Sequence, residues 1–298
     1  TQLLGREDIF GVTVNNNPTV TDVWNSTPAW GYPFLGSALA PTPEIATTIE
    51  GGFAQQVIGP TVYNFWNRLV YTEVGFYSTL SKDADSALGV NPSGTTAFKG
   101  LAPYWRVAVE PKWGANTFEL GTFGFDAALS PGRVTGFGTD HVVDVGVDAQ
   151  YQFLGERDAF SVQASFINEY QSLKASQALS NSTHGHNWLQ SLHVKASYYY
   201  QQTYGVTAGY FQVQGSTDPL LYGATSVNSS PNSDGWIGEL DYIPFNHGGP
   251  SFWPWLNAKL GLQYIYYDKF NGGRTNFDGS GRNAHDNNTL FAFVWLAF

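Results

Sequence analysis

Alternating apolar and polar residues recur along the chain in segments of about ten residues, separated by polar or glycine-rich connections. The clearest is HVVDVGVDAQYQF, residues 141–153. Successive side chains of a strand point to opposite faces, so this segment predicts a strand with one apolar and one polar face. The same pattern predicts about twelve strands, at residues 6–15, 52–63, 69–80, 104–113, 117–129, 141–153, 160–170, 188–200, 205–214, 235–245, 255–267 and 288–298.

The connections between these segments alternate between short turns and long loops, which predicts an antiparallel up-and-down arrangement. Strands of about 9–11 residues suffice to cross a bilayer. We therefore expect an all-β fold, a transmembrane up-and-down β-barrel of about 12 strands with short periplasmic turns and long extracellular loops. Residues 1–298 would form one barrel domain, with the long first loop, residues 16–50, folded over or into it. The alternative is a soluble β-sandwich.

The last predicted strand, NTLFAFVWLAF, is apolar on both faces. Alternation would turn Leu290 and Phe298 toward lipid, together with the residues of the same phase between them. It would turn an aromatic seam toward the lumen, formed by Phe291, Phe293 and Trp295. Either this seam is a packing site for the first loop, or it lines the path of an apolar ligand.

Charged residues of both signs fall on the polar face of the predicted strands, which indicates a mixed-charge wall rather than a hydrophobic core. The predicted lumen-lining residues are Glu73, Arg106, Glu110, Lys112, Asp144, Asp148, Glu169, His193, Lys195, Glu239, Asp241 and Lys259. They could line a hydrated passage that selects solutes by charge. Alternatively, they pair with one another and close a narrow interior, which requires nearly complete pairing.

Composition favours a membrane barrel over a soluble domain. Aromatic residues make up 16% of the chain and charged residues only 13%, about half the charged share of a soluble globular domain. No apolar run is long enough for a membrane-spanning helix, whereas a barrel distributes its apolar residues over alternate positions. The formal net charge of −10 argues against a nucleic-acid partner.

Motifs for catalysis or metal binding are weak, and we expect neither an enzyme nor a resident metal or cofactor. His184 and His186 form an isolated HxH pair, which is insufficient for a metal site without a third ligand. Residues 276–286 supply oxygens around glycines but lack the spacing of an EF-hand loop. Tryptophans near predicted strand ends are typical of a membrane boundary; these are Trp66, Trp105, Trp113, Trp253 and Trp255.

Four segments, DVWNSTPAWGYPF (22–34), APYWRVAVE (102–110), WLNAKLGLQYIYYDKFNG (255–272) and GRNAHDNNTLFAFVWLAF (281–298), resemble a family of proteobacterial outer-membrane proteins. These segments are similar to the barrel portion of chains often labelled as cytochrome c proteins. The resemblance implies a location in the bacterial outer membrane, contact with its lipid, and a periplasmic or lumenal haem protein as a candidate partner. With no Cys, this chain cannot itself attach a c-type haem.

Together, these features predict a porin-like channel that passes small solutes through a mixed-charge lumen. The first alternative is a barrel scaffold in an outer-membrane porin–cytochrome electron-transfer complex. The second is surface adhesion through the long loops.

Overall fold

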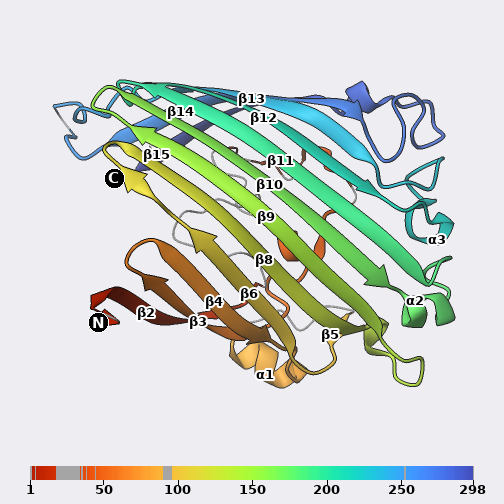
Figure 1. The fold of residues 1–298 in the computed structure, drawn as a ribbon. Helices are drawn as coiled ribbons and strands as arrows, with labels where there is room; N and C mark the ends of the chain where they lie inside the picture. Colours follow the sequence, from red (N-terminus) through yellow and green to blue (C-terminus); the bar gives the residue numbers. More distant parts are fainter. Residues whose placement is uncertain are drawn as a thin grey trace.

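The computed structural model describes residues 2–3, 5–17, 34, 36–37, 39–43, 45–89, 96–251 and 253–297. In this part of the chain the fold is all-β, and one antiparallel sheet contains all the strands (Figure 1). Its order is β1-β2-β3-β4-β6-β8-β9-β10-β11-β12-β13-β14-β15, with the short strands β5 and β7 both paired to β8. Neighbours in the sheet are thus neighbours in sequence, which confirms the predicted all-β class and up-and-down topology.

The long strands follow the predicted segments closely. They are β2 (Arg6–Asn15), β3 (Gly59–Trp66), β4 (Val70–Tyr77), β6 (Ala102–Val109), β8 (Asn116–Ser130), β9 (Asp140–Leu154), β10 (Asp158–Ser172), β11 (His186–Tyr200), β12 (Tyr204–Gly215), β13 (Ser233–Tyr242), β14 (Asn257–Lys269) and β15 (Thr289–Ala297).

Short elements lie outside the long strands, and the sequence predicted none of them except β7, which falls at the end of the segment predicted at 104–113. They are β1 (Gln2–Leu3), β5 (Ala97–Phe98), β7 (Lys112–Trp113), the α-helices α1 (Lys82–Ala87), α2 (Lys174–Ala178) and α3 (Pro219–Tyr222), and the 3-10 helices η2 (Thr48–Glu50), η3 (Pro131–Arg133) and η4 (Ala284–Asn287).

Several predicted strand boundaries are wrong, among them the end of the segment predicted at 104–113, because β6 stops at Val109. The segment predicted as a strand from residue 52 starts as a turn, because Gly51, which caps the end of η2, has a φ of 100°, and β3 begins only at Gly59. The connection between β13 and β14 spans residues 243–256 and is longer than predicted. It contains Pro244, Pro250 and Pro254, which lack the backbone N–H that a strand ladder needs.

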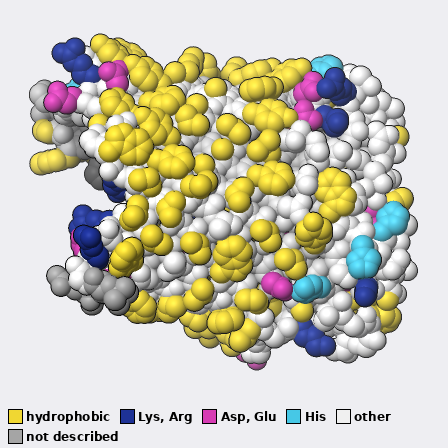
Figure 2. Space-filling model, in the orientation of Figure 1, with side chains coloured by type: hydrophobic (Ala, Val, Ile, Leu, Met, Phe, Trp, Pro, Cys, Tyr) yellow, Lys and Arg dark blue, Asp and Glu magenta, His cyan; other side chains and the backbone are white. Residues whose placement is uncertain are grey.

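The sheet has two chemically distinct faces. On β9, Val145 and Val147 are 45% and 50% exposed, whereas the alternating Asp144 and Asp148 are buried. We call the side that carries Asp144 the inner face and the side that carries Val145 the outer face. Apolar side chains cover much of the outer face (Figure 2). The strand alternation predicted for residues 141–153 therefore matches the observed burial.

The sheet is strongly curved and wraps its inner face around η2, the 3-10 helix of the β2–β3 connection (Figure 1). Among the described residues, β15 pairs with β14 alone, and β2 pairs with β1 and β3. The sheet is therefore not closed into a barrel in this part of the chain. No described helix is long and apolar enough to cross a membrane. Phe298, predicted to face lipid, lies outside the described residues.

An aromatic cluster fills one end of the space inside the curved sheet. Tyr77, Phe123 and Phe125 from the strands are buried together with Ile49 and other residues of the β2–β3 connection. Tyr77 and Phe125 meet edge to face, with ring centroids 6.3 Å apart. The expectation of a charged wall without a hydrophobic core is therefore wrong at this end, because the strands change to aromatic residues where the connection packs against them.

Candidate functional site

Most residues predicted to line a lumen lie on the inner face, because the strand register aligns them. Glu73 pairs in register with Arg106, and Asp144 with Glu169. The fully or nearly fully buried members are Glu73, Arg106, Glu110, Asp144, Asp148, Glu169, Glu239 and Asp241. Lys112 differs: its side chain is 56% exposed beside the β7–β8 turn, where it pairs with Glu110 at 2.8 Å.

Arg106 forms the centre of a buried ion-pair network between β6, β8 and β9. Its two terminal nitrogens donate to the two carboxylate oxygens of Asp148, each at 2.8 Å, and one also donates to Glu119 Oε1 at 3.0 Å. The guanidinium carbon also lies 5.8 Å from the ring centroid of Phe123. This bidentate geometry is the strong form of an Arg–carboxylate contact, and it fixes the register of three strands.

Two carboxylates of the inner face hold η2. The backbone N–H of Ile49 donates to Asp144 Oδ2 at 2.9 Å, and the N–H of Thr48 donates to Glu169 Oε2. These N–H groups lie in the first turn of the 3-10 helix and lack helical partners, so the carboxylates satisfy them. Strands β9 and β10 thereby anchor the connection that follows β2.

Glu50 links η2 to β11. Its Oε1 accepts from the hydroxyl of Ser191 at 3.0 Å and lies 3.2 Å from Nε2 of His193, while its Oε2 accepts from the Thr47 hydroxyl at 2.6 Å. Burial acts to raise the pKa of Glu50, but the hydrogen bond and charge of His193 and the two hydroxyl contacts outweigh it and lower the pKa. The Glu50 carboxylate is therefore held in its ionised form against the inner face.

Lys259 on β14 pairs with two acidic residues of β13. Its ammonium lies 2.9 Å from Glu239 Oε1 and 3.1 Å from Asp241 Oδ1. It also lies 5.4 Å from the ring centroid of Phe293. One ammonium thus offsets one of the two formal negative charges and holds both carboxylates together.

The predicted aromatic seam has a local packing role. The rings of Phe291 and Phe293 stack with centroids 5.6 Å apart. Phe293 also fills the space over its register partner Gly261, where any Cβ would lie 2.1 Å from the ring. Trp295 follows the same phase but is 59% exposed. The seam therefore covers Gly261 of the neighbouring strand β14. The sequence also predicted that the seam packs against the first loop, but residues 18–33 of that loop lie outside the described residues.

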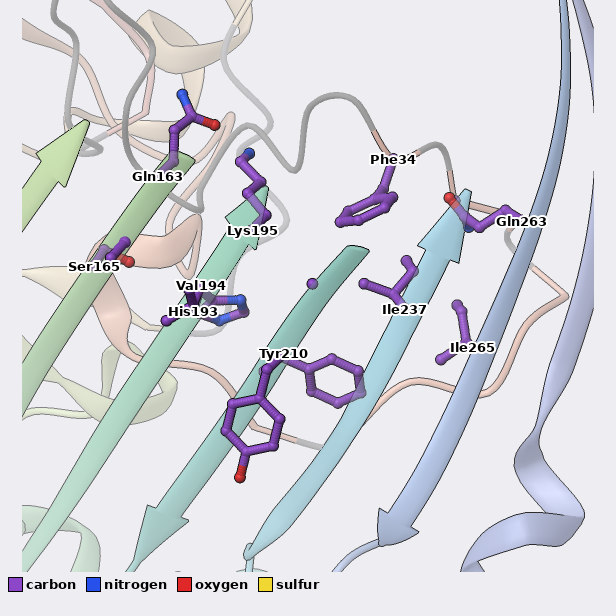
Figure 3. A pocket seen from close by; sticks show the side chains of 14 residues that line it. Phe34, Gln163, Ser165, His193, Val194, Lys195, Tyr210, Ile237, Gln263 and Ile265 are labelled. Atoms are coloured by element: carbon purple, nitrogen blue, oxygen red, sulfur yellow. The ribbon is translucent and has the colours of Figure 1, made fainter. Parts of the chain in front are cut away.

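A cavity of about 270 Å³ lies between the β2–β3 connection and strands β10 to β14 (Figure 3). Phe34, Phe211, Ile237 and Ile265 supply its apolar lining. Gln163, Ser165, His193, Lys195 and Gln263 supply its polar lining. Figure 3 shows Lys195 and Gln163 from one side of the cavity and Phe34 and Ile237 from the other. The cavity is thus amphipathic.

Gly209 lets the ring of Phe34 approach the sheet. A Cβ at this position would lie 3.1 Å from Phe34 and 3.0 Å from Ile237. A second cavity of about 280 Å³ adjoins the first and shares His193 and Phe211 with it. Glu50 lines this second cavity only. The pair formed by Glu50 and His193 therefore lies at the junction of the two spaces.

Asp218 organises the loops at the opposite end from the short turns. It is fully buried and accepts hydrogen bonds from the backbone N–H groups of Thr183 and His184 and from the Ser182 hydroxyl, at 2.7 to 3.1 Å. Burial acts to raise the pKa of Asp218, but these contacts outweigh it and the pKa falls well below its usual range. This carboxylate joins the β10–β11 loop to the β12–β13 loop.

The weak metal motifs are accounted for by loop structure. His184 uses its backbone N–H to bind Asp218, and its side chain is half exposed. In the 276–286 segment, Asp278 Oδ1 accepts from the N–H and hydroxyl of Ser280, and Asn276 Oδ1 accepts from the N–H of Gly281. Across the described ranges, no group of three His, Cys, Asp or Glu side chains could hold a metal ion.

Several inner-face residues were not predicted as site residues. Glu119 could have been found, because it shares the phase of Gly121 and Phe123 on β8. Glu50 and Phe34 could not have been found from the sequence, because they belong to an irregular connection whose position depends on contacts with distant strands. No known family model matches the sequence, and a search of curated proteins finds no significant match.

Proposed function

We propose that this chain is an outer-membrane channel, in which the sheet closes into a transmembrane barrel and small solutes pass along its mixed-charge inner face. The observation that carries the proposal is the inversion of the two faces: apolar side chains are exposed and charged ones are buried. A soluble protein rarely exposes a continuous apolar surface of this extent. A barrel in lipid requires one.

The dimensions of the sheet support a membrane location. The long strands contain 8 to 15 residues, and about 9–11 residues cross the hydrocarbon of a bilayer. Trp113 and Trp255 are 51% and 80% exposed at the end of the sheet that carries the short turns. Indole rings favour the headgroup region, so these residues suit one boundary of the membrane.

Closure is a requirement of the proposal, because unpaired backbone groups are costly in hydrocarbon. Strands β2 and β15 form the two edges of the long-strand sheet. With twelve long strands in an antiparallel series, these edges run in opposite directions and can pair with each other. Their outer faces are apolar, with Val12 61% and Val294 62% exposed.

Cross-linking tests closure directly, since the chain has no native Cys. Cysteines at Val12 and, in turn, at 292, 294 and 296 should form a disulfide at one register when the protein is in lipid. A pair at Val12 and Val206 on β12, far from both edges, is the matched control. If no β15 position cross-links more than this control, direct β2–β15 closure is wrong.

The inner face offers a route for small polar solutes past fixed charges. Lys259 keeps 11% of its side-chain surface exposed and presents a fixed charge to this route, whereas Arg106, Asp148 and Glu119 are fully enclosed and fix the wall behind it. Such walls discriminate solutes by charge. The η2 segment lies against this face and narrows the route, because Asp144 and Glu169 bind its backbone.

Planar-bilayer conductance tests the channel. Purified protein with all loops intact should give discrete single-channel steps that depend on salt. A membrane-inserted protein without steps would contradict an open channel. If the protein then co-purifies from native membranes with a haem protein, recognised by its Soret absorbance, the alternative of an electron-transfer scaffold replaces the channel.

A further inference from the structure

We propose that Asp144 and Glu169 share a single proton beneath η2, and that loss of this proton at alkaline pH releases η2 and widens the channel. The inference rests on the proposed channel and names a way in which that channel is regulated. Asp144 on β9 and Glu169 on β10 are register partners, and both are fully buried. Two carboxyl groups therefore lie side by side on the inner face, away from water.

The 3-10 helix η2 bridges the two carboxyl groups. The backbone N–H of Thr48 donates to Glu169 Oε2, and the N–H of the next residue, Ile49, donates to Asp144 Oδ2 at 2.9 Å. The two acidic side chains are also in hydrogen-bonding contact with each other. A hydrogen bond between two carboxyl groups needs a proton on one of them, because ionised carboxylates can only accept.

The second oxygen of Asp144 is the place for that proton. Without a proton, Asp144 Oδ1 is a buried atom that no donor of the described residues reaches. Glu169 Oε1, in contrast, accepts from the side-chain amide of Gln171 at 2.5 Å. Leaving a buried acceptor unsatisfied is costly. A proton on Asp144 Oδ1 turns this atom into a donor toward Glu169 and satisfies it.

No cation takes the place of the proton. Every Lys, Arg and His of the chain lies in the part that the structure describes, and none of them forms an ion pair with Asp144 or Glu169 there. On β8, the residue in register with Asp144 is Phe125, which carries no charge. The other titratable groups on the packed elements have partners of their own: Glu50 on η2 with His193 on β11, Asp148 on β9 with Arg106, and Asp140 on β9 with the N–H groups of Ala175 and Ser176.

Loss of the proton places two negative charges in one dry site, with the ionised Glu50 close by. Like charges repel strongly where water is excluded, so the two carboxylates separate. The N–H groups of Thr48 and Ile49 are adjacent in the chain, and separated carboxylates cannot both reach them. At acidic and neutral pH the shared proton therefore holds η2 against the wall, and at alkaline pH η2 is released and the route widens.

Single-channel conductance of the full chain as a function of pH tests this regulation. The unaltered protein should conduct more at about pH 10 than at about pH 6, a range that covers a carboxyl group perturbed by burial and a like charge. Asp144→Asn should lose this rise, because the neutral amide still accepts from Ile49 and donates to Glu169 at every pH. Glu156→Gln, in the exposed turn between the same two strands, is the matched control and should keep the rise. His193→Gln should keep it too, which separates the carboxyl pair from the imidazole.

Two further measurements do not depend on conductance. Infrared difference spectra between the unaltered protein and Asp144→Asn should contain the carbonyl band of a protonated carboxylic acid, and this band should disappear at alkaline pH. Hydrogen-exchange protection of residues 47–50, corrected for the intrinsic effect of pH, should fall over the same range.

The outcomes separate this inference from the channel. Conductance steps that do not change with pH, an equal rise in Asp144→Asn, or a missing carbonyl band overturns the shared proton and leaves the channel standing. A carbonyl band and a pH-dependent loss of protection without any conductance steps contradict the channel alone. If Asp144→Asn does not fold, constant protection of residues 47–50 in the unaltered protein across the pH range overturns the proposal.

Discussion

Replacing Arg106 with Met tests whether the buried ion pairs hold the sheet together. Arg106, Asp148 and Glu119 are all essentially inaccessible to solvent. The substitution removes three hydrogen bonds to charged acceptors at 2.8 to 3.0 Å and leaves two buried carboxylates without their cation. These hydrogen bonds join β6 to β8 and β9, so the substitution weakens the contacts among all three strands.

We expect a large loss of unfolding free energy, because removing one partner of a buried ion pair costs about 3–5 kcal/mol. At about 1.4 kcal/mol per factor of ten, this changes the unfolding equilibrium by roughly two to three and a half orders of magnitude. The matched control is Arg274→Met. Arg274 pairs with Asp268 at 2.7 Å, but its side chain is 70% exposed, and exposed pairs contribute about 0–1 kcal/mol.

Urea unfolding in phospholipid vesicles, followed by tryptophan fluorescence, measures both variants. A double variant, Arg106→Met with Asp148→Leu, removes one orphaned charge and should recover part of the loss, because apolar replacement of both partners is far less costly. If Arg106→Met and Arg274→Met destabilise equally, the Arg106 network does not stabilise the sheet and the ionic account of the inner face is wrong.

Three further predictions concern the close packing, the loops and the η2 anchor. Gly146→Ala should destabilise the protein by about 1–3 kcal/mol in the same urea assay, because its Cβ would lie 2.3 Å from the fully buried ring of Phe123; Gly238→Ala, which meets no atom within 4 Å, is the control. Asp218→Asn should increase proteolysis of the 179–185 loop. The pKa of Asp218 in the folded protein is lowered from 3.8. The stability that its carboxylate gives the loops is therefore complete above pH 3.8 and is lost as the pH falls toward the folded pKa. Equal protease resistance of the 179–185 loop in the variant would contradict a loop-anchoring role for Asp218. Glu50→Gln should increase both hydrogen exchange at residues 47–50 and single-channel conductance, because it weakens the contact to His193; unchanged exchange would show that Asp144 and Glu169 hold η2 without it.

The strands were predictable because their signal is local. Residues 141–153 alternate strictly, and β9 spans Asp140–Leu154 with the predicted faces. The prediction failed where an irregular connection competes with a strand. Residues 52–58 include apolar side chains, but Phe53 and Val57 pack into the aromatic cluster from irregular backbone rather than from a strand.

The composition of the inner face was predictable only in part. Its charges follow from alternation, since Asp144, Asp148 and Glu169 have the expected phase. The ion-pair partners of these residues cannot be predicted from alternation. Arg106 on β6 pairs with Asp148 on β9, although β8 lies between these two strands in the sheet. The cavity was not predictable either, since Phe34 reaches it from the first loop.

Spin-label accessibility tests whether the outer face of the sheet lies in lipid. The chain has no Cys, so single cysteines at residues 143, 145 and 147 of β9, and at the cavity-lining residues 163 and 195 of the inner face, can each carry a unique nitroxide label in vesicles. We expect labels at 143, 145 and 147 to collide preferentially with lipid-soluble oxygen, and labels at 163 and 195 not to do so. Uniform access of a water-soluble relaxation agent to all five positions would contradict an outer face in lipid and, with it, the proposed channel.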